Sequence, residues 1–560
     1  MSDAVDTGSG GRAAALRRPP SEVMRLARMG SAHPTRLSFL RQLLRRIDAE
    51  GWRFDRPVWE MDDRGVGHAV YRMTGPDGSL SLVAFAHDLP EDQRSDRVIA
   101  TAWDATFTLF DGTPDADDLA RLAANVPLQE AGRVTARELS LSRANRSVRL
   151  FNHVVDRLAA GRQPDAQMLR ETGYLMRTTA VYGAGKFGAA DRAMIAGRPA
   201  LSAPFQAEML SVWLIRAFTV DLVEHLAGKR GGDRAVRLDP DLRRGLGVGN
   251  STGLGMAPFL VRHPVLLNNW MTVREEALAR VRAQQGADDA ALAGFRRAVA
   301  TARQNAADWQ SAHPIQQEKL ADLRDGLAKL ADHVETGWDT RAAHPWDDLW
   351  GWAEGALPME AQEALLAVML EPHGHLIDDL ADGMKAEDES QFGIDGTMRV
   401  GALRAIMRER YDWAIEVDYD RPEACARFWY ISEEKLEPRL GARFEEEGAA
   451  RELPLDTGRQ AAALWRTLED VPEDTPLARV LLAHPENRLI ARRAQIAANH
   501  PYAEIRDNLI DTEMLPIDLL RCKLALFGAS RFDPRSDRWV RISLFQGAPY
   551  PGEPLDRETL

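Results

Sequence analysis

Helical periodicity through the middle of the chain is the feature that most constrains its fold. Between Asp115 and Ala386, apolar residues recur at spacings of three and four in one segment after another. Several of these segments end on Gly, the residue that most often follows the last turn of a helix. The clearest examples are DDLARLAANV, SVRLFNHVVDRLAAG, AEMLSVWLIRAFTVDLVEHLAG and VREEALARVRAQQG. The sequence therefore predicts a large central helical body.

Strand-like segments lie on either side of this body. The runs GHAVYRMTG, SLSLVAFAHDL and RVIATAWDATFTLFDG precede it, and PDG between the first two is a hairpin turn signal. Near the C-terminus, ARFWYIS and RWVRISLFQ have strand character, and they flank helices such as GRQAAALWRTLEDV and NRLIARRAQIAA. We therefore expect a mainly α, overall α+β protein, with small antiparallel β elements near both ends, confined to about 60–115 and 425–550.

The domain organisation follows from these patterns and from composition. A basic amphipathic helix is expected over Pro34–Gly51, because its apolar residues share one helical face, and the first twenty residues are rich in Gly, Ser, Pro and Arg, which is typical of disorder. The apolar face comprises Leu37, Leu40, Leu43, Leu44 and Ile47. The expected segments are a disordered tail (1–20), an N-terminal α+β meander (21–114), a central helical domain with two Gly-rich loops (115–386) and a C-terminal mixed α/β region (387–560).

Composition and charge narrow the class of protein. The chain has 560 residues and a formal net charge of −13 with no basic domain, which disfavours nucleic acid as a partner. The most apolar stretch, Phe205–Ala227, carries four charged residues and does not fit a membrane span. The N-terminus lacks the apolar run of a signal peptide, and two cysteines, Cys425 and Cys522, form no disulfide framework. We expect a cytoplasmic protein, and leave open whether it forms a homo-oligomer.

The segment GLGVGNSTGLGM, Gly245–Met256, contains five glycines. Glycine lets a ligand approach the main chain, and N–H groups ahead of a helix attract anions. A flexible linker is the alternative, but linkers seldom carry interleaved apolar residues such as Val248 and Leu254. We therefore predict a loop that binds an anion. Its predicted substrate-binding residues are Gly249, Asn250, Ser251, Thr252, Gly253, Gly255 and, beyond the glycines, Arg262.

A second glycine cluster, MRTTAVYGAGKFGAADR, sets Lys186 within the glycine-rich segment 183–188. Lys186 is one of only seven lysines, against 64 arginines. A lysine in a glycine turn delivers a point charge where the backbone also donates hydrogen bonds. The alternative is a turn between helices with a solvated lysine. We expect both glycine-rich loops to converge on one small anionic molecule, with Lys186 and Arg177 among the binding residues.

Candidates for proton transfer are His263, Glu208 and Tyr182. Six of the thirteen histidines, His263 among them, precede proline, and because proline favours the first helical position these pairs are expected to mark helix starts. EPHGHLIDD holds His373 and His375, but its Pro and Gly predict a turn and no second histidine cluster is evident. No metal site is therefore predicted, and the cofactor is left unassigned.

No motif fixes a reaction. The chain lacks the GxxxxGK[ST] phosphate loop. The run NSTGLGMAPFLVRHP is similar to part of the signature of the fumarase/aspartase lyases, but its Met and Pro are separated and the signature lysine is absent, so no family is assigned. Two hypotheses follow. One is a cytosolic enzyme that acts on a small anionic metabolite, carboxylate or phosphoryl, by lyase, isomerase or transferase-type acid–base chemistry. The alternative is a non-enzymatic binding or scaffold protein with a regulatory nucleotide site.

Overall fold

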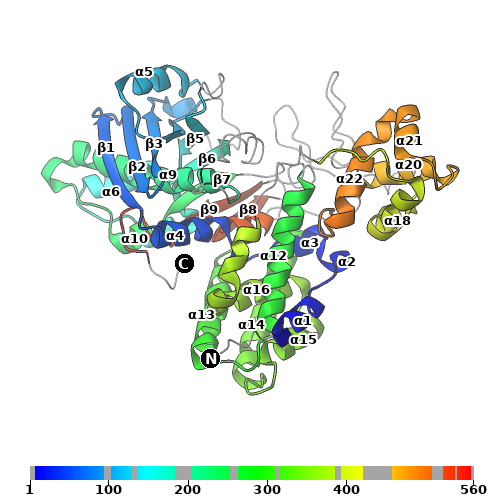
Figure 1. Cartoon of the computed structure of the whole chain (residues 1–560). Coiled ribbons are helices and arrows are strands. Elements are labelled where there is room, and N and C mark those ends of the chain that lie inside the picture. The colour runs from blue at the N-terminus through cyan, green and yellow to red at the C-terminus, as the bar shows by residue number, and fades with distance from the viewer. Residues whose placement is uncertain are drawn as a thin grey trace, which may run out of the picture. The chain divides into compact units, whose positions relative to one another are not determined.

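The computed structural model of the chain describes twelve groups of residues, which divide into two compact units (Figure 1). The described residues are 7–93, 102–128, 135–182, 198, 201, 203–251, 263–309, 314–384, 392–419, 457–506, 521–536 and 539–555. The helical unit comprises Met1–Ala32, Gly253–Cys522 and Ser536–Arg538. The sheet unit comprises His33–Thr252, Lys523–Arg535 and Trp539–Leu560.

The sheet unit is built on a nine-stranded sheet in the order β1-β2-β3-β4-β5-β6-β7-β9-β8. Where the register is described, neighbouring strands are antiparallel, except that β6 and β7 run parallel. The strands are β1 Arg53–Met61, β2 Gly67–Gly75, β3 Gly78–Ala86, β4 Ala105–Asp111, β5 Glu138–Arg146, β6 Tyr174–Tyr182, β7 Gly247–Ser251, β8 Arg531–Ser536 and β9 Trp539–Leu544.

Helices pack on both faces of this sheet because apolar residues alternate along its strands. Val83 of β3 belongs to a buried cluster with Leu122 of α5. Ala84, the next residue on β3, faces the other side of the sheet and pairs with Phe107 of β4. On that side, the Phe107 ring meets the ring of Phe218 of α9 edge to face. The helices of this unit are α4 Phe39–Ala49, α5 Ala116–Asn125, α6 Phe151–Ala159, α7 Ala166–Thr172, α9 Gln206–Gly231 and α10 Pro240–Arg244, with short 3-10 turns at Glu91–Gln93 and Gly232–Arg234 and a π-helical turn at Lys523–Phe527.

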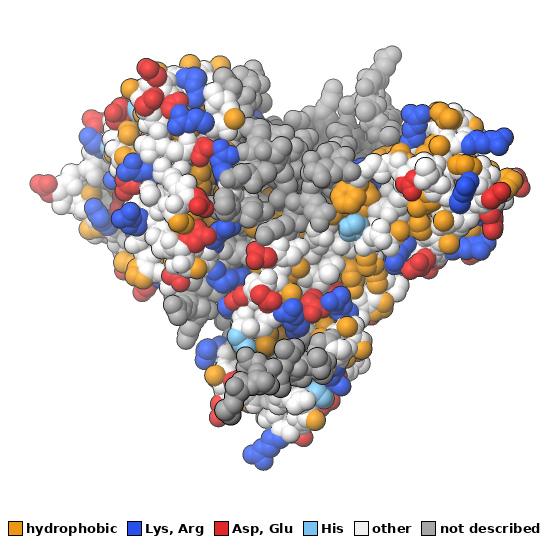
Figure 2. Space-filling view, in the orientation of Figure 1, with side chains coloured by type: hydrophobic (Ala, Val, Ile, Leu, Met, Phe, Trp, Pro, Cys, Tyr) orange, Lys and Arg blue, Asp and Glu red, His pale blue; other side chains and the backbone are white. Residues whose placement is uncertain are grey.

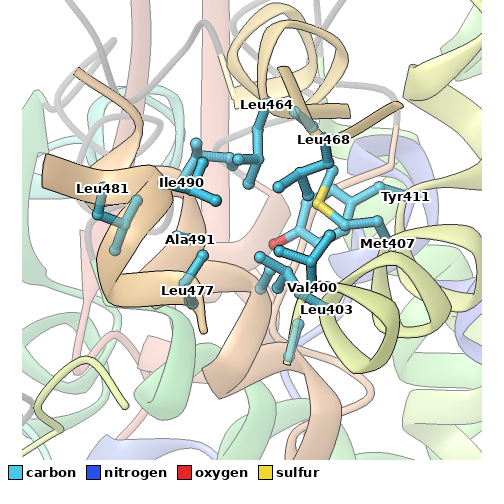
Figure 3. Packing of buried hydrophobic residues seen from close by; sticks show 14 of the residues in the cluster. Val400, Leu403, Met407, Tyr411, Leu464, Leu468, Leu477, Leu481, Ile490 and Ala491 are labelled. Atoms are coloured by element: carbon cyan, nitrogen blue, oxygen red, sulfur yellow. The ribbon is translucent and has the colours of Figure 1, made fainter. Parts of the chain in front are cut away.

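The helical unit is built from helices with buried apolar faces. One of its cores joins α18, α19, α20, α21 and α22, whose side chains converge as Figure 3 shows. Within the described residues of the whole chain, every helix is too short or too polar to cross a bilayer. The helices of this unit are α1 Thr7–Ala15, α2 Pro20–Val23, α3 Leu26–Met29, α12 Pro264–Arg282, α13 Asp289–Asp308, α14 Pro314–Thr336, α15 Pro345–Ala356, α16 Met359–Leu370, α17 Gly374–Ile377, α18 Val400–Arg410, α19 Asp412–Ile415, α20 Thr457–Glu469, α21 Leu477–Ala483 and α22 Arg488–Asn499, with 3-10 turns at Glu371–His373, Asp378–Met384 and Pro485–Asn487.

Several sequence predictions are confirmed. The chain is mixed α+β and mainly helical, and strands β2, β3 and β9 occupy the runs identified from sequence. The hairpin at PDG forms between β2 and β3, where Gly75 pairs with Gly78. The amphipathic helix forms as α4, and its five apolar residues are buried. The expected strand ARFWYIS lies outside the described residues.

The expectation that sheet is confined to small elements near the two ends is wrong, because β5, β6 and β7 fall within 115–386. β5 and β7 were not predicted because their pattern is weakly apolar. β5 alternates Leu with Ser in ELSLSRANR, and β7 is the five-residue GVGNS. Residues 7–20 also differ from the expected disordered tail: they contain α1, and Arg18 is buried.

Candidate functional site

The parallel pair β6 and β7 is the part of the sheet unit where a functional site is best placed. Tyr174 pairs with Gly247, and Thr178 pairs with Asn250. Since the two strands run in the same direction, their carboxyl ends lie at one edge of the sheet, the position where open sheets with parallel strands commonly bind ligands. We call this the β6–β7 carboxyl edge. β6 ends at Tyr182, and the glycine-rich segment 183–188 follows it directly in the sequence. β7 ends at Ser251, and the rest of the Gly245–Met256 segment follows it.

Part of the predicted Gly245–Met256 loop is strand, so the expectation of an open loop is wrong over Gly247–Ser251. The backbone of β7 pairs with β6 on one side and with β9 on the other. Its glycines serve close packing: a Cβ on Gly249 would lie 2.7 Å from Cγ of Tyr174, and one on Gly247 would lie 2.5 Å from the Leu544 carbonyl oxygen. Gly247 and Gly249 therefore leave room for a neighbouring strand and for an aromatic ring. At these two positions the backbone does not surround a ligand.

A π-helical turn over Lys523–Phe527 brings a lysine to this part of the sheet. The rings of Phe39, Phe205 and Phe527 hold the turn, with centroid separations of 4.6 to 5.2 Å. The Thr35 hydroxyl and backbone N–H both donate to the Ala525 carbonyl. Phe205, which caps α9, has φ of 59°, an unfavourable conformation for a residue other than glycine and one that clusters at functional sites.

A chain of side-chain hydrogen bonds leads from this lysine into the sheet. The Lys523 Nζ lies 3.5 Å from Oδ1 of Asn250, and Nδ2 of Asn250 donates to the Thr178 hydroxyl at 3.0 Å. That hydroxyl in turn donates to the Gly249 carbonyl at 3.3 Å. Each group has a defined role as donor or acceptor, so Asn250 presents its carbonyl oxygen to the lysine. Thr178 is four residues from the end of β6 and Asn250 is one residue from the end of β7, and the two are paired on one face of the sheet.

Burial changes the acidity of this lysine. Lys523 is 4% exposed, and burial lowers its pKa from 10.5 to about 7 because the interior disfavours the ammonium form. Its Nζ also lies 5.3 Å from the centroid of the Phe527 ring. Near neutral pH the group is therefore divided between an ammonium that attracts anions and an amine that accepts protons or attacks electrophiles.

The structure places some predicted site residues near this lysine and others elsewhere. Asn250 and Gly249 take part in the hydrogen-bonded chain that leads from Lys523. Arg177 is buried on β6, but adjacent strand residues point to opposite faces, so it does not share the face of Thr178. Glu208 is buried in the first turn of α9, the helix that Phe205 caps. His263 caps α12 in the helical unit, ahead of Pro264 at the first helical position.

The remaining predicted residues stay predictions. Tyr182 and Ser251 are the last residues of β6 and β7. Lys186, Thr252, Gly253, Gly255 and Arg262 lie outside the described residues. The interpretation of His-Pro as a helix start is confirmed at His263, His344 and His484, whereas His500 follows the end of α22.

His373, one member of the H-x-H pair, packs inside the helical unit. Its ring meets that of Trp346 edge on at 4.6 Å, and its Nδ1 lies 2.8 Å from the Met369 carbonyl oxygen. Burial lowers its pKa to about 4, so the imidazole is neutral at pH 7. Among the residues that the structure describes, no group of three or more His, Cys, Asp or Glu is arranged to hold a metal ion.

Two other buried polar clusters hold distant segments of the chain together. In the helical unit, Arg18 and Arg274 both contact Glu275 and Glu363 at 2.8 to 3.2 Å, which fastens the N-terminal segment to α12 and α16. In the sheet unit, Arg216 of α9 donates to the carbonyls of Leu246, Arg244 and Ala548, which ties the C-terminal segment to that helix. On the visible face, acidic and basic side chains are interspersed (Figure 2).

Lys523 was not predicted as a site residue from the sequence. It stands in RCKLALFG, where an apolar run surrounds one of only seven lysines. That context is a usable signal, because lysine is almost never fully buried without a specific reason. Its partner Asn250 was identified, but as part of a loop.

Comparison of the chain with known protein families, with curated proteins and with solved structures found no significant match.

Proposed function

We propose that the protein is an enzyme that acts on a small anionic metabolite, with a carboxylate or phosphoryl group, at the β6–β7 carboxyl edge. Lys523 contacts the anion and exchanges a proton with the substrate, and Asn250 positions the lysine. The observation that carries the proposal is the hydrogen-bonded chain from the buried Lys523 Nζ through Asn250 to Thr178, beside the carboxyl ends of two parallel strands.

The cost of burying this lysine supports a functional role. An ammonium removed from water loses several kcal/mol of hydration, which contacts such as that with the Asn250 amide oxygen at 3.5 Å have to offset. A methionine or leucine of similar length would fill the same space without that cost. Strongly shifted pKa values of this kind are concentrated at catalytic and binding sites, where the shift matches the group to its task.

An anion is the ligand that suits this environment. Its negative charge would pair favourably with the ammonium form of Lys523, and the low local dielectric would strengthen this pair relative to water. With a pKa of about 7, the same group takes up and releases protons near neutral pH, as general acid–base catalysis requires. The glycine-rich segments 183–188 and 245–256 remain predicted anion ligands, with Lys186 as a second cation; their continuity with β6 and β7 supports that prediction.

The test is binding of a panel of anions to the full-length protein. Inorganic phosphate, acetate, malonate and glycerol 2-phosphate are added at constant ionic strength, and the melting temperature is measured. At least one anion should stabilise the protein. Lys523→Met should weaken its affinity by about 10- to 150-fold, the loss expected for a hydrogen bond to a charged group.

Lys229→Met is the matched control. Lys229 lies in the same unit, but its side chain is 47% exposed and its Nζ pairs with Asp63 at 2.6 Å, so its removal should leave anion affinity unchanged. The proposal fails if no anion raises the melting temperature, or if Lys523→Met and Lys229→Met bind the anion as the wild type does. Binding without turnover of any substrate would instead favour a non-enzymatic anion-binding protein.

A further inference from the structure

We infer that Arg404 and Arg408 of α18, with Trp465 of α20, form a second anion site that binds the phosphoryl group of a phosphate ester. These three residues belong to the helical unit, whereas Lys523 belongs to the sheet unit, so the inference goes beyond the proposed function. The ester is either a small phosphorylated compound or a phosphorylated side chain of another protein, because both present the same group.

The two arginines share one aromatic ring. Their Cζ atoms lie 5.7 Å (Arg404) and 5.2 Å (Arg408) from the centroid of the Trp465 ring, within the range of cation–π attraction. Four residues separate them along α18, so both extend from one face of that helix. Trp465 is partly buried and packs against the apolar core that joins α18 to α22. The ring is therefore a fixed support for both guanidinium groups.

Neither arginine has a counter-charge within the described part of the chain. Apart from the shared ring, their side chains make no hydrogen bond or ion pair there. Glu409, the acidic residue next to Arg408, instead pairs with Arg410 at 3.1 Å. Like charges four residues apart on a helix repel each other, and the chain carries a net charge of −13. Two unpaired arginines on one helical face of such an acidic protein indicate a counter-charge supplied from outside.

The chemistry of the guanidinium group determines the class of ligand. Stacking on an aromatic ring uses the flat face of the group and leaves the N–H donors at its edge for an acceptor. Those donors bind carboxylate and phosphoryl oxygens in pairs. A carboxylate has a single charge, which one arginine satisfies. A phosphoryl group carries roughly two negative charges near pH 7 and three acceptor oxygens, so it can accept from both arginines and balance both charges.

The test is isothermal titration of the full-length protein carrying Lys523→Met, which removes the other proposed anion site. The probes are inorganic phosphate, O-phosphoserine and a short peptide with a central phosphoserine, with serine and the unphosphorylated peptide as comparisons. We expect phosphorylated probes to bind and the comparisons not to bind. Similar affinity for all three phosphorylated probes would assign a small phosphorylated compound as the ligand. Binding of the phosphopeptide alone would assign a phosphorylated protein.

Substitutions locate the site. Arg404→Gln and Arg408→Gln should each weaken the affinity about fivefold, the effect of one exposed charge pair, and the double variant should bind more weakly than either. The matched control is Arg479→Gln with Arg488→Gln, since both side chains are exposed on α21 and α22 and the loss of charge is the same. This control should bind normally. Trp465→Phe should retain most of the affinity, because it keeps an aromatic support.

The pH dependence separates this site from the one at Lys523. Affinity should rise as the phosphoryl group loses its second proton near pH 6, and should then stay constant to about pH 9, because arginine remains protonated. Absence of binding by every phosphorylated probe would overturn the inference. So would equal losses of affinity in the Arg404→Gln/Arg408→Gln variant and in the control. Neither result bears on the proposed function, which depends on Lys523.

Discussion

The Nζ of Lys523 and the Oδ1 of Asn250 lie 3.5 Å apart, although the two residues are separated by 273 positions in the sequence. This relationship joins a π-helical turn near the C-terminus to a strand inside the sheet. The chain crosses the helical unit between these two positions and then returns. The candidate site therefore forms only because the C-terminal segment returns to the sheet unit.

Lys523→Met should stabilise the protein near neutral pH. The pKa of Lys523 is about 7 in the folded chain against an ordinary 10.5, so between these values the unfolded chain binds more protons and stability falls as pH decreases. The stability gap between variant and wild type should be largest at and below pH 7, up to about 5 kcal/mol, and should close toward pH 10.5. Urea unfolding of both proteins at pH 7, 8.5 and 10 measures this gap. A stability gap that is the same at all pH values would show that folding does not lower the pKa of Lys523.

Asn250→Asp should raise the pKa of Lys523, because a carboxylate would replace the amide oxygen 3.5 Å from Nζ. The lysine would then stay charged, and the new carboxylate would compete with an anionic ligand for its ammonium group. We expect weaker binding of phosphate at pH 7. Isothermal titration with phosphate, with Asn250→Ala as the neutral comparison, measures this effect. Tighter phosphate binding by the Asp variant than by the Ala variant would contradict the assigned geometry.

Gly249→Ala should destabilise the sheet unit by about 1–3 kcal/mol, the usual cost of overpacking a core. The new Cβ would lie 2.7 Å from Cγ of the Tyr174 ring. Gly228→Ala in α9 is the control, because a Cβ there meets no atom within 4 Å, and this change should be neutral or stabilising. Urea unfolding in a Tyr174→Ala background should show most of the Gly249→Ala penalty removed. A penalty that persists there would point to backbone conformation instead of the ring contact.

Much of the fold was predictable from local patterns. α4, α9 and α12 have apolar residues at helical spacing, and β2 and β3 surround a recognisable turn. β7 was not predictable, because its glycines are explained by Tyr174 and Leu544, which lie on other strands. The role of Asn250 likewise depends on contacts with Thr178 and Lys523 that no local pattern encodes.

Glu363→Gln should destabilise the helical unit by about 3–5 kcal/mol at pH 7, because the buried guanidinium groups of Arg18 and Arg274 would then share the single carboxylate of Glu275. Burial alone would raise the pKa of Glu363, but Arg18 and Arg274 lower it from 4.5 to about 2. The stabilisation from this carboxylate is therefore complete above pH 4.5 and is lost as pH falls toward 2.

Thermal unfolding of wild type and Glu363→Gln between pH 7 and 3 checks this behaviour. The difference in stability should shrink on acidification. The control is Glu409→Gln, since that side chain is 66% exposed and its change should stay within about 0.5 kcal/mol at every pH. A difference for Glu363→Gln that does not depend on pH would contradict the ion-pair network.

The central claim is that Lys523 holds a small anion, and the pH dependence of anion affinity tests it most directly. The dissociation constant of the best anion from the panel is measured by isothermal titration from pH 6 to 9 for the wild type and for Lys523→Met. Because the ammonium form binds the anion and the pKa of Lys523 is about 7, wild-type affinity should fall as pH rises above 7, approaching a tenfold loss per pH unit. Lys523→Met should bind weakly and without this dependence. An affinity that is constant across this range, or a dependence that survives in Lys523→Met, would contradict the account.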